Sequence, residues 1–308
     1  MQTQSDTALA ITGLTKRYDA VTVLDALELS ITRGAIHGLV GLNGSGKTTT
    51  IECLLGLQGF QAGTVTVLGH EPTQLYRTQG RVVAIFDTPS LHPGLTVRQN
   101  LELARLLCDK PVRSPAHVEK LLGIERYSRF RVSQLSLGNK RRASIAQALL
   151  GNPELIILDE PFNGLDAGGV DDVLQLIQHL NRDAGTSFFL CSHQLPYLEQ
   201  VCTHIAILHK GRIATSGTIT DLLGGASSLA LVRTEQIDAA RALIDAHPGL
   251  QARPLDANGY LPVDLGDVSS SELNALLVSN RIGVAELQMQ RASLTGLFRE
   301  INGGGDNV

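Results

Sequence analysis

The 308-residue sequence has a formal net charge of -4, and 43% of its residues are hydrophobic. This length exceeds what one hydrophobic core commonly supports, so we expect one full-sized domain and a smaller one. The slightly acidic balance excludes a chain whose main task is to coat nucleic acid, and the hydrophobic content excludes extensive disorder.

The cysteines and the N-terminus indicate where the protein works. Four cysteines are scattered without a CxxC pair, at positions Cys53, Cys108, Cys191 and Cys202. This spacing favours neither a disulfide framework nor a four-cysteine zinc site, so we expect a reducing cytoplasm. The first ten residues lack the pattern of a signal peptide, and no apolar run reaches the ~20 residues that span a bilayer. We therefore expect a chain that does not cross the membrane by itself.

The first part of the chain is predicted to be mainly β. Residues 8–14 and 24–32 alternate apolar and polar side chains, which is typical of half-buried strands. Residues 35–40 form a further apolar strand that ends in a glycine-rich turn, and residues 48–57 have helical spacing, with Gly59 expected to close the helix. Residues 63–69 are predicted to return to a strand.

After Pro93 the pattern becomes helical and then returns to buried strands. Residues 97–108 and 116–123 carry apolar side chains at three- and four-residue spacings. The stretches "LIILDEP" and "TSFFLCSH", at 155–161 and 186–193, are continuous apolar runs typical of parallel strands buried on both faces. Residues 205–217 predict a hairpin with Lys210 and Gly211 at its turn.

A small-residue break at residues 222–228 predicts the domain boundary. Beyond it the sequence alternates short strand and helix patterns, which indicates a small α+β domain. We predict a first domain at 8–224, a second at 225–303 and a disordered tail at 304–308. The predicted segments of the second domain are 229–233, 236–247, 251–256, 271–280, 283–289 and 293–301.

The stretch "GLNGSGKTT" predicts a phosphate-binding loop, because it follows a strand and precedes a helix. Its glycines let successive backbone N–H groups face inward, and the helix N-terminus adds a partial positive charge. Lys47 is expected to reach the β and γ phosphates, and the Thr48 hydroxyl to bind Mg²⁺. The predicted ATP-binding residues of this loop are Gly41, Asn43, Gly44, Ser45, Gly46, Lys47, Thr48 and Thr49.

The stretch "LIILDEP" supplies two acids at the end of a buried strand. Asp159 is placed to hold Mg²⁺, and Glu160 to orient or deprotonate an attacking water. Together with the phosphate loop, this pair predicts an enzyme that hydrolyses ATP to ADP and phosphate.

The order of these stretches resembles that of ATP-binding subunits of ABC transporters, from Tyr18 to about Gly217, roughly two thirds of the chain. The resemblance implies an α/β P-loop NTPase fold of the ABC ATPase type. Such a fold has a mixed sheet, an antiparallel β subdomain and a helical insert, here at about 90–150. The small α+β domain would follow it.

In this family "LSLGN", Leu135 to Asn139, occupies the signature position that is commonly LSGGQ. Ser136, the amide of Gly138 and the helix dipole behind them form an anion site without a phosphate loop of their own. The resemblance implies that a second copy completes each site, as a head-to-tail homodimer around two Mg-ATP. The basic run Lys140 to Arg142 is interpreted as a solvated helix face.

Other residues take roles by the same resemblance. Tyr18 matches the aromatic residue that stacks on adenine, although a plain strand-end tyrosine is an alternative. Asp166 matches the loop that crosses the dimer interface, and His193 the histidine that contacts the γ-phosphate. Asp87 stands where the family has a glutamine that touches Mg²⁺, and a carboxylate still coordinates a hard cation.

Leu137 and Asn139 also depart from the family signature. The Ser-Leu-Gly form and an acid at position 87 resemble the bacterial antibiotic-efflux and lantibiotic-immunity branch. This branch implies the motor subunit of an exporter, peripheral at the cytoplasmic face of the bacterial membrane. Its partner would be a separate permease of the ABC-2 type, docked near Leu91 to Leu103, with no nucleic acid bound.

Two other functions are consistent with the same motifs. A non-transport ABC ATPase acting on ribosomes or DNA commonly has two such domains or a long coiled-coil insert, and the sequence has neither. A regulatory module that senses ATP without turnover fits the acid at Asp87 but is disfavoured by the intact Glu160.

Overall fold

The computed structural model describes residues 6–88, 90–224, 229–256, 258–290 and 293–303. The chain divides into two compact units, residues 1–219 and 220–308. The predicted break at 222–228 lies partly outside the described residues, and so does the predicted disordered tail. The domain limits proposed from the sequence, 224/225 and 303/304, therefore stay predictions.

An antiparallel sheet of three strands contains the N-terminal strands. Its order is β2-β1-β4, with β1 (Thr7–Tyr18), β2 (Val21–Thr32) and β4 (Ala62–Val67). Alternate residues of β2 are buried and exposed: Leu27, Leu29 and Ile31 are buried, and the polar residues between them are exposed. The predicted period-two pattern is confirmed, because one face of this sheet packs on the core.

A second sheet has six strands, and the predicted site residues Lys47, Asp159 and His193 lie at or after the carboxyl ends of three of them. Its order is β5-β6-β7-β3-β8-β9, parallel except for the β8–β9 pair. Its strands are β3 (Ile36–Val40), β5 (Val82–Ile85), β6 (Leu155–Asp159), β7 (Ser187–Ser192), β8 (His204–His209) and β9 (Arg212–Thr218). Strands β6 and β7 are buried at every position, as their apolar runs predict. The β8–β9 hairpin turns at Lys210 and Gly211, as predicted.

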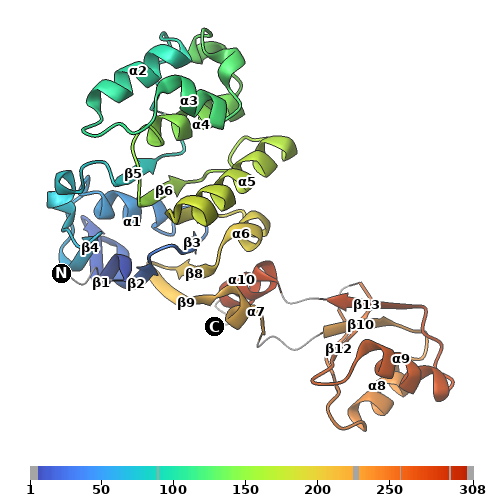
Figure 1. Cartoon of the computed structure of the whole chain (residues 1–308). Coiled ribbons are helices and arrows are strands. Elements are labelled where there is room, and N and C mark those ends of the chain that lie inside the picture. The colour runs from blue at the N-terminus through green and yellow to red at the C-terminus, as the bar shows by residue number, and fades with distance from the viewer. Residues whose placement is uncertain (1–5, 89, 225–228, 257, 291–292, 304–308) are drawn as a thin grey trace. The chain divides into compact units, whose positions relative to one another are not determined.

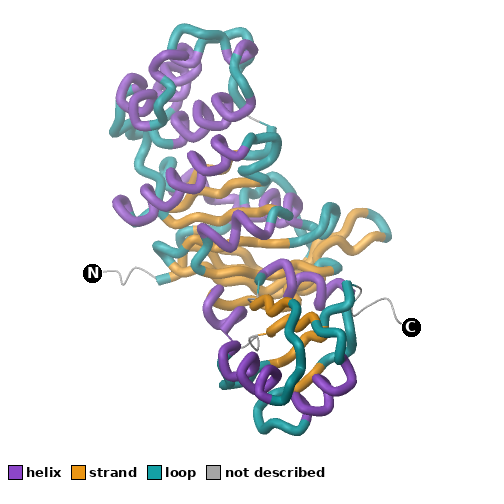
Figure 2. The backbone as a smooth tube through the Cα atoms, turned by 90° about the vertical axis from the view of Figure 1, so that its right-hand side faces the viewer, coloured by secondary structure: helices purple, strands orange, loops and turns teal. Residues whose placement is uncertain are grey.

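The helical insert forms a cluster at one end of the first unit, beside the β5 edge of the six-stranded sheet (Figures 1 and 2). It consists of α2 (Val97–Leu107), α3 (Pro115–Leu121) and α4 (Leu137–Ala148), with short 3-10 helices η2 (Glu125–Tyr127) and η3 (Val132–Gln134) between α3 and α4. Thr96 caps α2, because its side chain accepts from the Gln99 amide while the Gln99 side chain accepts from the Thr96 amide. The remaining helical elements of this unit are α1 (Lys47–Leu54), η1 (Pro72–Thr78), α5 (Ala167–Ala184) and α6 (Leu195–Val201).

The first helix ends earlier than the sequence predicts. Helix α1 stops at Leu54 rather than near Gly59, since Gly56 adopts a left-handed φ of +69°. The Gly56 and Leu57 amides then donate back to the carbonyls of Cys53 and Glu52, which closes the last turn. The prediction chose the wrong glycine of this segment.

In its described residues, the second unit contains a four-stranded antiparallel sheet, and a helix follows the first and the third of its strands along the chain. The sheet order β11-β12-β10-β13 is that of a ferredoxin-like βαββαβ arrangement. Its elements are β10 (Leu229–Arg233), α8 (Ile237–Asp245), β11 (Gln251–Ala252), β12 (Leu261–Asp264), α9 (Ser270–Ser279) and β13 (Glu286–Gln290), with α7 (Ile219–Gly224) before them and α10 (Leu294–Gly303) after them. Apolar residues of both helices and of the sheet form its own core.

The sequence analysis did not predict β12, one of the two inner strands of this sheet. Pro262 within it has no N–H to donate, and a proline argues against an inner strand. In the structure Pro262 pairs with Leu231, and its carbonyl accepts from the Arg253 amide. The predicted strand at 251–256 is correspondingly short, covering Gln251–Ala252.

Across the described ranges, no helix combines the length and the apolar character that crossing a bilayer requires.

A buried histidine in β3 predicts the pH dependence of stability. His37 is 4% exposed, stacks on His204 with ring centroids 5.8 Å apart, and has an Nε2 atom without a partner among the described residues. Burial, and then the nearby His204, lower the pKa of His37 to about 4. As the pH falls from 6.5 towards 4, the unfolded chain takes up a proton that the folded chain does not.

We therefore predict that His37 reduces the free energy of unfolding by about 3 kcal/mol between pH 6.5 and pH 4. Urea unfolding of the wild type and of His37→Phe across this range measures the difference. The Phe variant should lose less stability than the wild type as the pH falls. Parallel pH profiles for the two proteins would contradict the assignment.

Candidate functional site

Three parallel strands bring the predicted catalytic residues to one edge of the six-stranded sheet. The phosphate loop follows β3, and His193 follows β7. Asp159 is the last residue of β6, and Glu160 comes directly after it. Because β3, β7 and β6 are neighbours in parallel register, their carboxyl ends lie side by side. A cavity of about 340 Å³ opens there. It is lined by Val23, Asn43, Gly44, Gly46, Lys47, Thr48, Thr49, Asp87, Asp159, Glu160, Asn163 and His193.

The phosphate loop curls tightly into the first turn of α1. Gly46 caps this helix with a φ of +109°, and a side chain on it would lie 2.6 Å from the Leu24 side chain. Lys47 is 6% exposed, and its Nζ donates to the carbonyls of Gly41 and Leu42 at 2.8 and 3.3 Å. The first amides of α1 have no partner within the helix, so this loop offers N–H groups and a fixed ammonium to an anion.

The acid at the end of β6 has the geometry of a ligand for a hard cation. The Thr48 hydroxyl donates to Asp159 Oδ2 at 3.1 Å. The other oxygen, Oδ1, is buried and has no hydrogen-bond partner in the part of the chain that the structure describes. Burial raises the pKa of Asp159, and the charges of Glu160 and Asp87 raise it further. A cation near these oxygens would supply the missing partner and the missing positive charge, so the residues fit Mg²⁺.

Glu160 is held from several sides. Its Oε1 lies 2.9 Å from His193 Nδ1 and 3.5 Å from Lys47 Nζ, and its Oε2 accepts from the Ser192 hydroxyl at 2.9 Å. Its backbone has a φ of +46°, which is strained for a residue with a side chain. The carboxylate is therefore pre-oriented toward the cavity, as a group that accepts a proton from water requires.

Three residues of this site were not predicted from the sequence: Val23, Asn163 and Ser192. Ser192 directly precedes His193 and bonds Glu160, and Asn163 lines the cavity and accepts from Gln194 Nε2 at 3.1 Å. The position of Ser192 at the end of a buried strand was an available signal. Asn163 gave none, since it lies in a loop after the acids.

Several predicted site residues are not in the lining of this cavity. Ser136 caps α4 and accepts from Asn139 Nδ2 at 3.0 Å, and Asp166 caps α5 and accepts from the Gly169 amide at 2.8 Å. Tyr18 is 40% exposed, with Lys16 Nζ 4.5 Å from its ring centroid. The predicted site residues that do not line this cavity are Tyr18, Gly41, Ser45, Ser136, Gly138 and Asp166.

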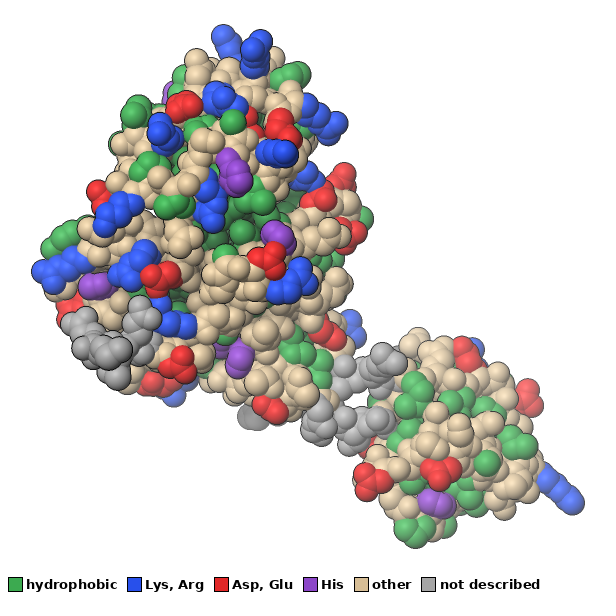
Figure 3. All heavy atoms as spheres, viewed as in Figure 1, with side chains coloured by type: hydrophobic (Ala, Val, Ile, Leu, Met, Phe, Trp, Pro, Cys, Tyr) green, Lys and Arg blue, Asp and Glu red, His purple; other side chains and the backbone are tan. Residues whose placement is uncertain are grey.

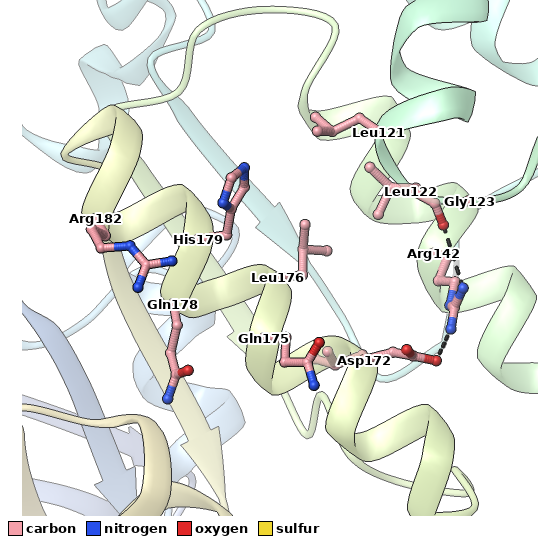
Figure 4. Close-up of a pocket in the computed structure, with 11 residues that line it drawn as sticks. Leu121, Leu122, Gly123, Arg142, Asp172, Gln175, Leu176, Gln178, His179 and Arg182 are labelled. Atoms are coloured by element: carbon pink, nitrogen blue, oxygen red, sulfur yellow. Dashed lines mark hydrogen bonds and ion pairs between the residues drawn. The ribbon is translucent and has the colours of Figure 1, made fainter.

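The interpretation of Lys140 to Arg142 as a solvated helix face is wrong for Arg141, while Lys140 and Arg142 are half-buried. Arg141 is 1% exposed and is bonded within the core of the first unit. Arg142 donates to the Leu122 carbonyl at 3.4 Å and pairs with Asp172 on α5 (Figure 4). The predicted exposure failed because α4 packs between the rest of the insert and the sheet.

Arg142 borders a separate cavity of about 530 Å³ between the helical insert and α5. In the space-filling view of Figure 3, Lys and Arg side chains are spread over the helical insert. The basic side chains that line this cavity each lie beside a carboxylate: Arg142 pairs with Asp172, Arg182 pairs with Asp183, and His179 Nδ1 lies 2.9 Å from the same Asp183. It therefore has no free charged group directed at a ligand among these residues.

The unusual Leu137 of the signature has a partner in the same chain. Gly164, in the "NGLD" loop, has a φ of +67°, and a side chain added there would lie 2.3 Å from Leu137 Cδ2. The leucine side chain therefore packs directly on the Gly164 backbone. This contact joins the signature to the loop before α5.

Comparisons with known proteins agree with this geometry. The family profile described as ABC transporter matches residues 24–163. The bacitracin transport ATP-binding protein BcrA of Bacillus licheniformis is 31% identical over 304 residues, covering 97% of this chain and 98% of the relative. BcrA of Enterococcus faecalis is 36% identical over 214 residues, covering 68% and 69%. A solved ATP-binding subunit of an ABC transporter is 28% identical with a TM-score of 0.64, covering 71% of this chain and 95% of that one.

The contact between Leu137 and Gly164 yields a double-mutant test. Gly164→Ala places a side chain against Leu137 and in a left-handed conformation that costs about 1 kcal/mol. Leu137→Ala removes the contacted atoms. We predict that Gly164→Ala destabilises the wild type more than the Leu137→Ala variant, by at least about 0.5 kcal/mol in urea unfolding. Additive effects of the two substitutions would contradict the contact.

Proposed function

We propose, from the premise that this chain belongs to the ABC transporter ATP-binding family, that it is the motor subunit of a bacterial antibiotic exporter. Membership rests on the BcrA relative, which is similar over nearly the whole chain, and it confirms the resemblance of the sequence motifs. The chain is accordingly the ATP-binding subunit of a transporter and an ATPase with the α/β fold of ABC cassettes.

The convergence of Lys47, Thr48, Asp159, Glu160 and His193 at one sheet edge is the observation that carries the proposed mechanism. In this proposal the loop amides and Lys47 hold the β and γ phosphates of ATP. Glu160 orients the attacking water and takes its proton, and His193 stabilises the γ-phosphate. Catalysis would thus depend on positioning and charge, without a covalent intermediate.

Mg²⁺ would be held by Thr48 and Asp159, with Asp87 as a further oxygen ligand. The buried and unpartnered Asp159 Oδ1, within the described residues, supports this assignment. When bound, the cation would neutralise phosphate charge that Lys47 alone does not balance. Asp87 lines the same cavity, and it has two carboxylate oxygens, of which Oδ1 is paired with Arg141.

ATP would bind between two copies of the chain arranged head to tail. The signature serine is not part of the cavity that contains the phosphate loop, and Ser136 begins a helix of its own. Its hydroxyl, the Gly138 amide and the dipole of α4 would meet the γ-phosphate held by the other copy. Asp166 would line the interface, and Tyr18 would stack on adenine.

Export is favoured over import by the extent of the similarity. The B. licheniformis relative, whose name states bacitracin transport, matches this chain through its second unit as well as the first. We therefore propose an antibiotic of the bacitracin type as cargo. The subunit would be peripheral, at the cytoplasmic face of the bacterial membrane, and would drive a separate ABC-2 type permease.

An apolar groove on the helical insert supports a docking position for the permease. A cavity of about 260 Å³ lies between β5, α2 and α4, and it includes Ile85, Ser90, Ala104 and Leu107. Next to it, Leu103, Leu106 and Leu107 expose 48%, 79% and 80% of their surface. A helix of the permease with an apolar face would cover these leucines.

The two alternatives are disfavoured. A ribosomal or DNA-directed ATPase has no support in relatives that are named as transport proteins. A module that senses ATP without turnover would have no use for Glu160 pre-oriented by Ser192, His193 and Lys47.

We predict that Glu160→Gln lowers ATP turnover at least about 100-fold, because the amide no longer takes a proton from water. The same variant should form a stable ATP-dependent dimer, since it keeps the oxygen and the size of the side chain. Phosphate release and gel filtration with Mg-ATP measure the two effects. Unchanged turnover would remove Glu160 from its proposed role.

The cargo is tested in a bacitracin-sensitive bacterium. We predict that expressing the chain with the membrane protein encoded beside it raises the bacitracin concentration that stops growth. The Glu160→Gln variant should give no protection at equal expression. Equal protection by the two forms, or none with an active ATPase, would contradict bacitracin export.

A further inference from the structure

Arg141 is a buried cation that no step described above uses. It lies on α4, five residues after the signature serine, and its side chain is 1% exposed. A guanidinium in such a place is strongly destabilising unless opposite charge and hydrogen-bond acceptors surround it. Its partners therefore indicate what it does.

The guanidinium contacts two segments of the catalytic edge, the edge of the six-stranded sheet where Lys47, Glu160 and His193 meet. Its Nη1 donates to the Phe86 carbonyl at 2.8 Å, and its Nη2 donates to the Asp87 carbonyl at 3.1 Å. The same Nη2 lies 3.3 Å from Asp87 Oδ1 and 3.2 Å from the Glu160 carbonyl. One side chain thus joins the loop after β5, the end of β6 and the signature helix.

The charges around the cavity explain why a cation is needed there. Asp87, Asp159 and Glu160 line it together with one lysine, Lys47, and a bound triphosphate adds further negative charge. Burial lowers the pKa of Arg141, while the charge of Asp87 and then that of Asp159 raise it. An arginine nevertheless stays protonated at neutral pH. Arg141 therefore supplies a positive charge behind Asp87, on the side away from solvent.

The position of Arg141 also determines where the signature lies. Ser136 caps α4, and the Arg141 side chain projects from the same helix little more than one turn later. A rigid helix transmits the position of one end to the other. Fixing Arg141 on Asp87 and Glu160 consequently fixes the Ser136 end of α4 relative to the acids of this chain.

We propose that Arg141 is a positioning residue that balances the charge of Asp87 and ties the signature helix to the catalytic edge. Asp87 is tolerated beside the triphosphate because Arg141 is paired with it. The proposal rests on the ATP site described above and assigns it a residue pair that acts as a unit. Position 87 and position 141 should therefore change together.

The test uses the full chain and three variants: Arg141→Gln, Asp87→Gln and the double variant. Titration of each protein with a fluorescent N-methylanthraniloyl ATP in the presence of Mg²⁺ gives the dissociation constant of the nucleotide. Phosphate release with ATP gives KM and kcat. Arg141→Gln leaves Asp87 without its counter-charge, so we expect the dissociation constant and KM to rise at least about tenfold. Asp87→Gln removes that repulsion, so the double variant should bind at least about fivefold more tightly than Arg141→Gln.

Arg142→Gln is the matched control. It removes a neighbouring arginine of the same helix whose partners, Leu122 and Asp172, lie outside the ATP cavity (Figure 4). Its dissociation constant should stay within about threefold of the wild type, because no charge beside the triphosphate changes. An increase equal to that of Arg141→Gln would overturn the proposal.

The double variant separates charge balance from mere space filling. If Arg141 only fills the core, Asp87→Gln does not improve Arg141→Gln in folding, in binding or in KM, and that result overturns the proposal. Rescue of a poorly folded Arg141→Gln by Asp87→Gln supports it. A wild type that binds the nucleotide without hydrolysing it would instead contradict the ATPase function. The dissociation constants of the variants would still test the pairing of Arg141 with Asp87.

Discussion

The site depends on one geometric constraint: three parallel strands end at the same edge of a sheet. Strands β3, β7 and β6 are neighbours, so the lysine after the first, the histidine after the second and the acids of the third meet in one cavity. Lys47 Nζ lies 3.5 Å from Glu160 Oε1 although the two residues are far apart in the sequence. Strands β6 and β7 are buried at every position, so a slip of either strand would draw the polar residues at its end into the apolar interior of the sheet.

Much of this was predictable because short-range patterns carry it. The glycines of the phosphate loop, the apolar runs before Asp159 and His193, and the alternation in β2 all reflect local backbone requirements. Strand β12 was not predictable, because Pro262 contradicts the local rule; its missing N–H lies on the side of the short β11, so the pairing with β10 loses no donor. Gly56 and Gly59 were indistinguishable as helix ends until the φ of Gly56 was known.

The residues that sequence reasoning misjudged are those whose role comes from distant contacts. Arg141 belongs to a basic run that looks solvated, yet it is buried against segments far from it in the chain. Leu137 departs from the family signature, and its side chain packs on Gly164 in another loop. Both Arg141 and Leu137 lie in the first turns of α4. The helix that begins with Ser136 is thus attached to the catalytic edge of its own chain, while its capping serine stays outside that chain's cavity.

The central claim is that each ATP site is built from two chains, and mixing two inactive variants tests it most directly. Lys47→Ala removes the phosphate-loop lysine, and Ser136→Arg blocks the signature. Each variant alone should be inactive, since both sites of its dimer are damaged. The mixture forms dimers that have one intact site, so we expect ATP hydrolysis well above that of either variant alone. Full activity of Ser136→Arg by itself, or a mixture no more active than its components, would contradict an ATP site built from two chains.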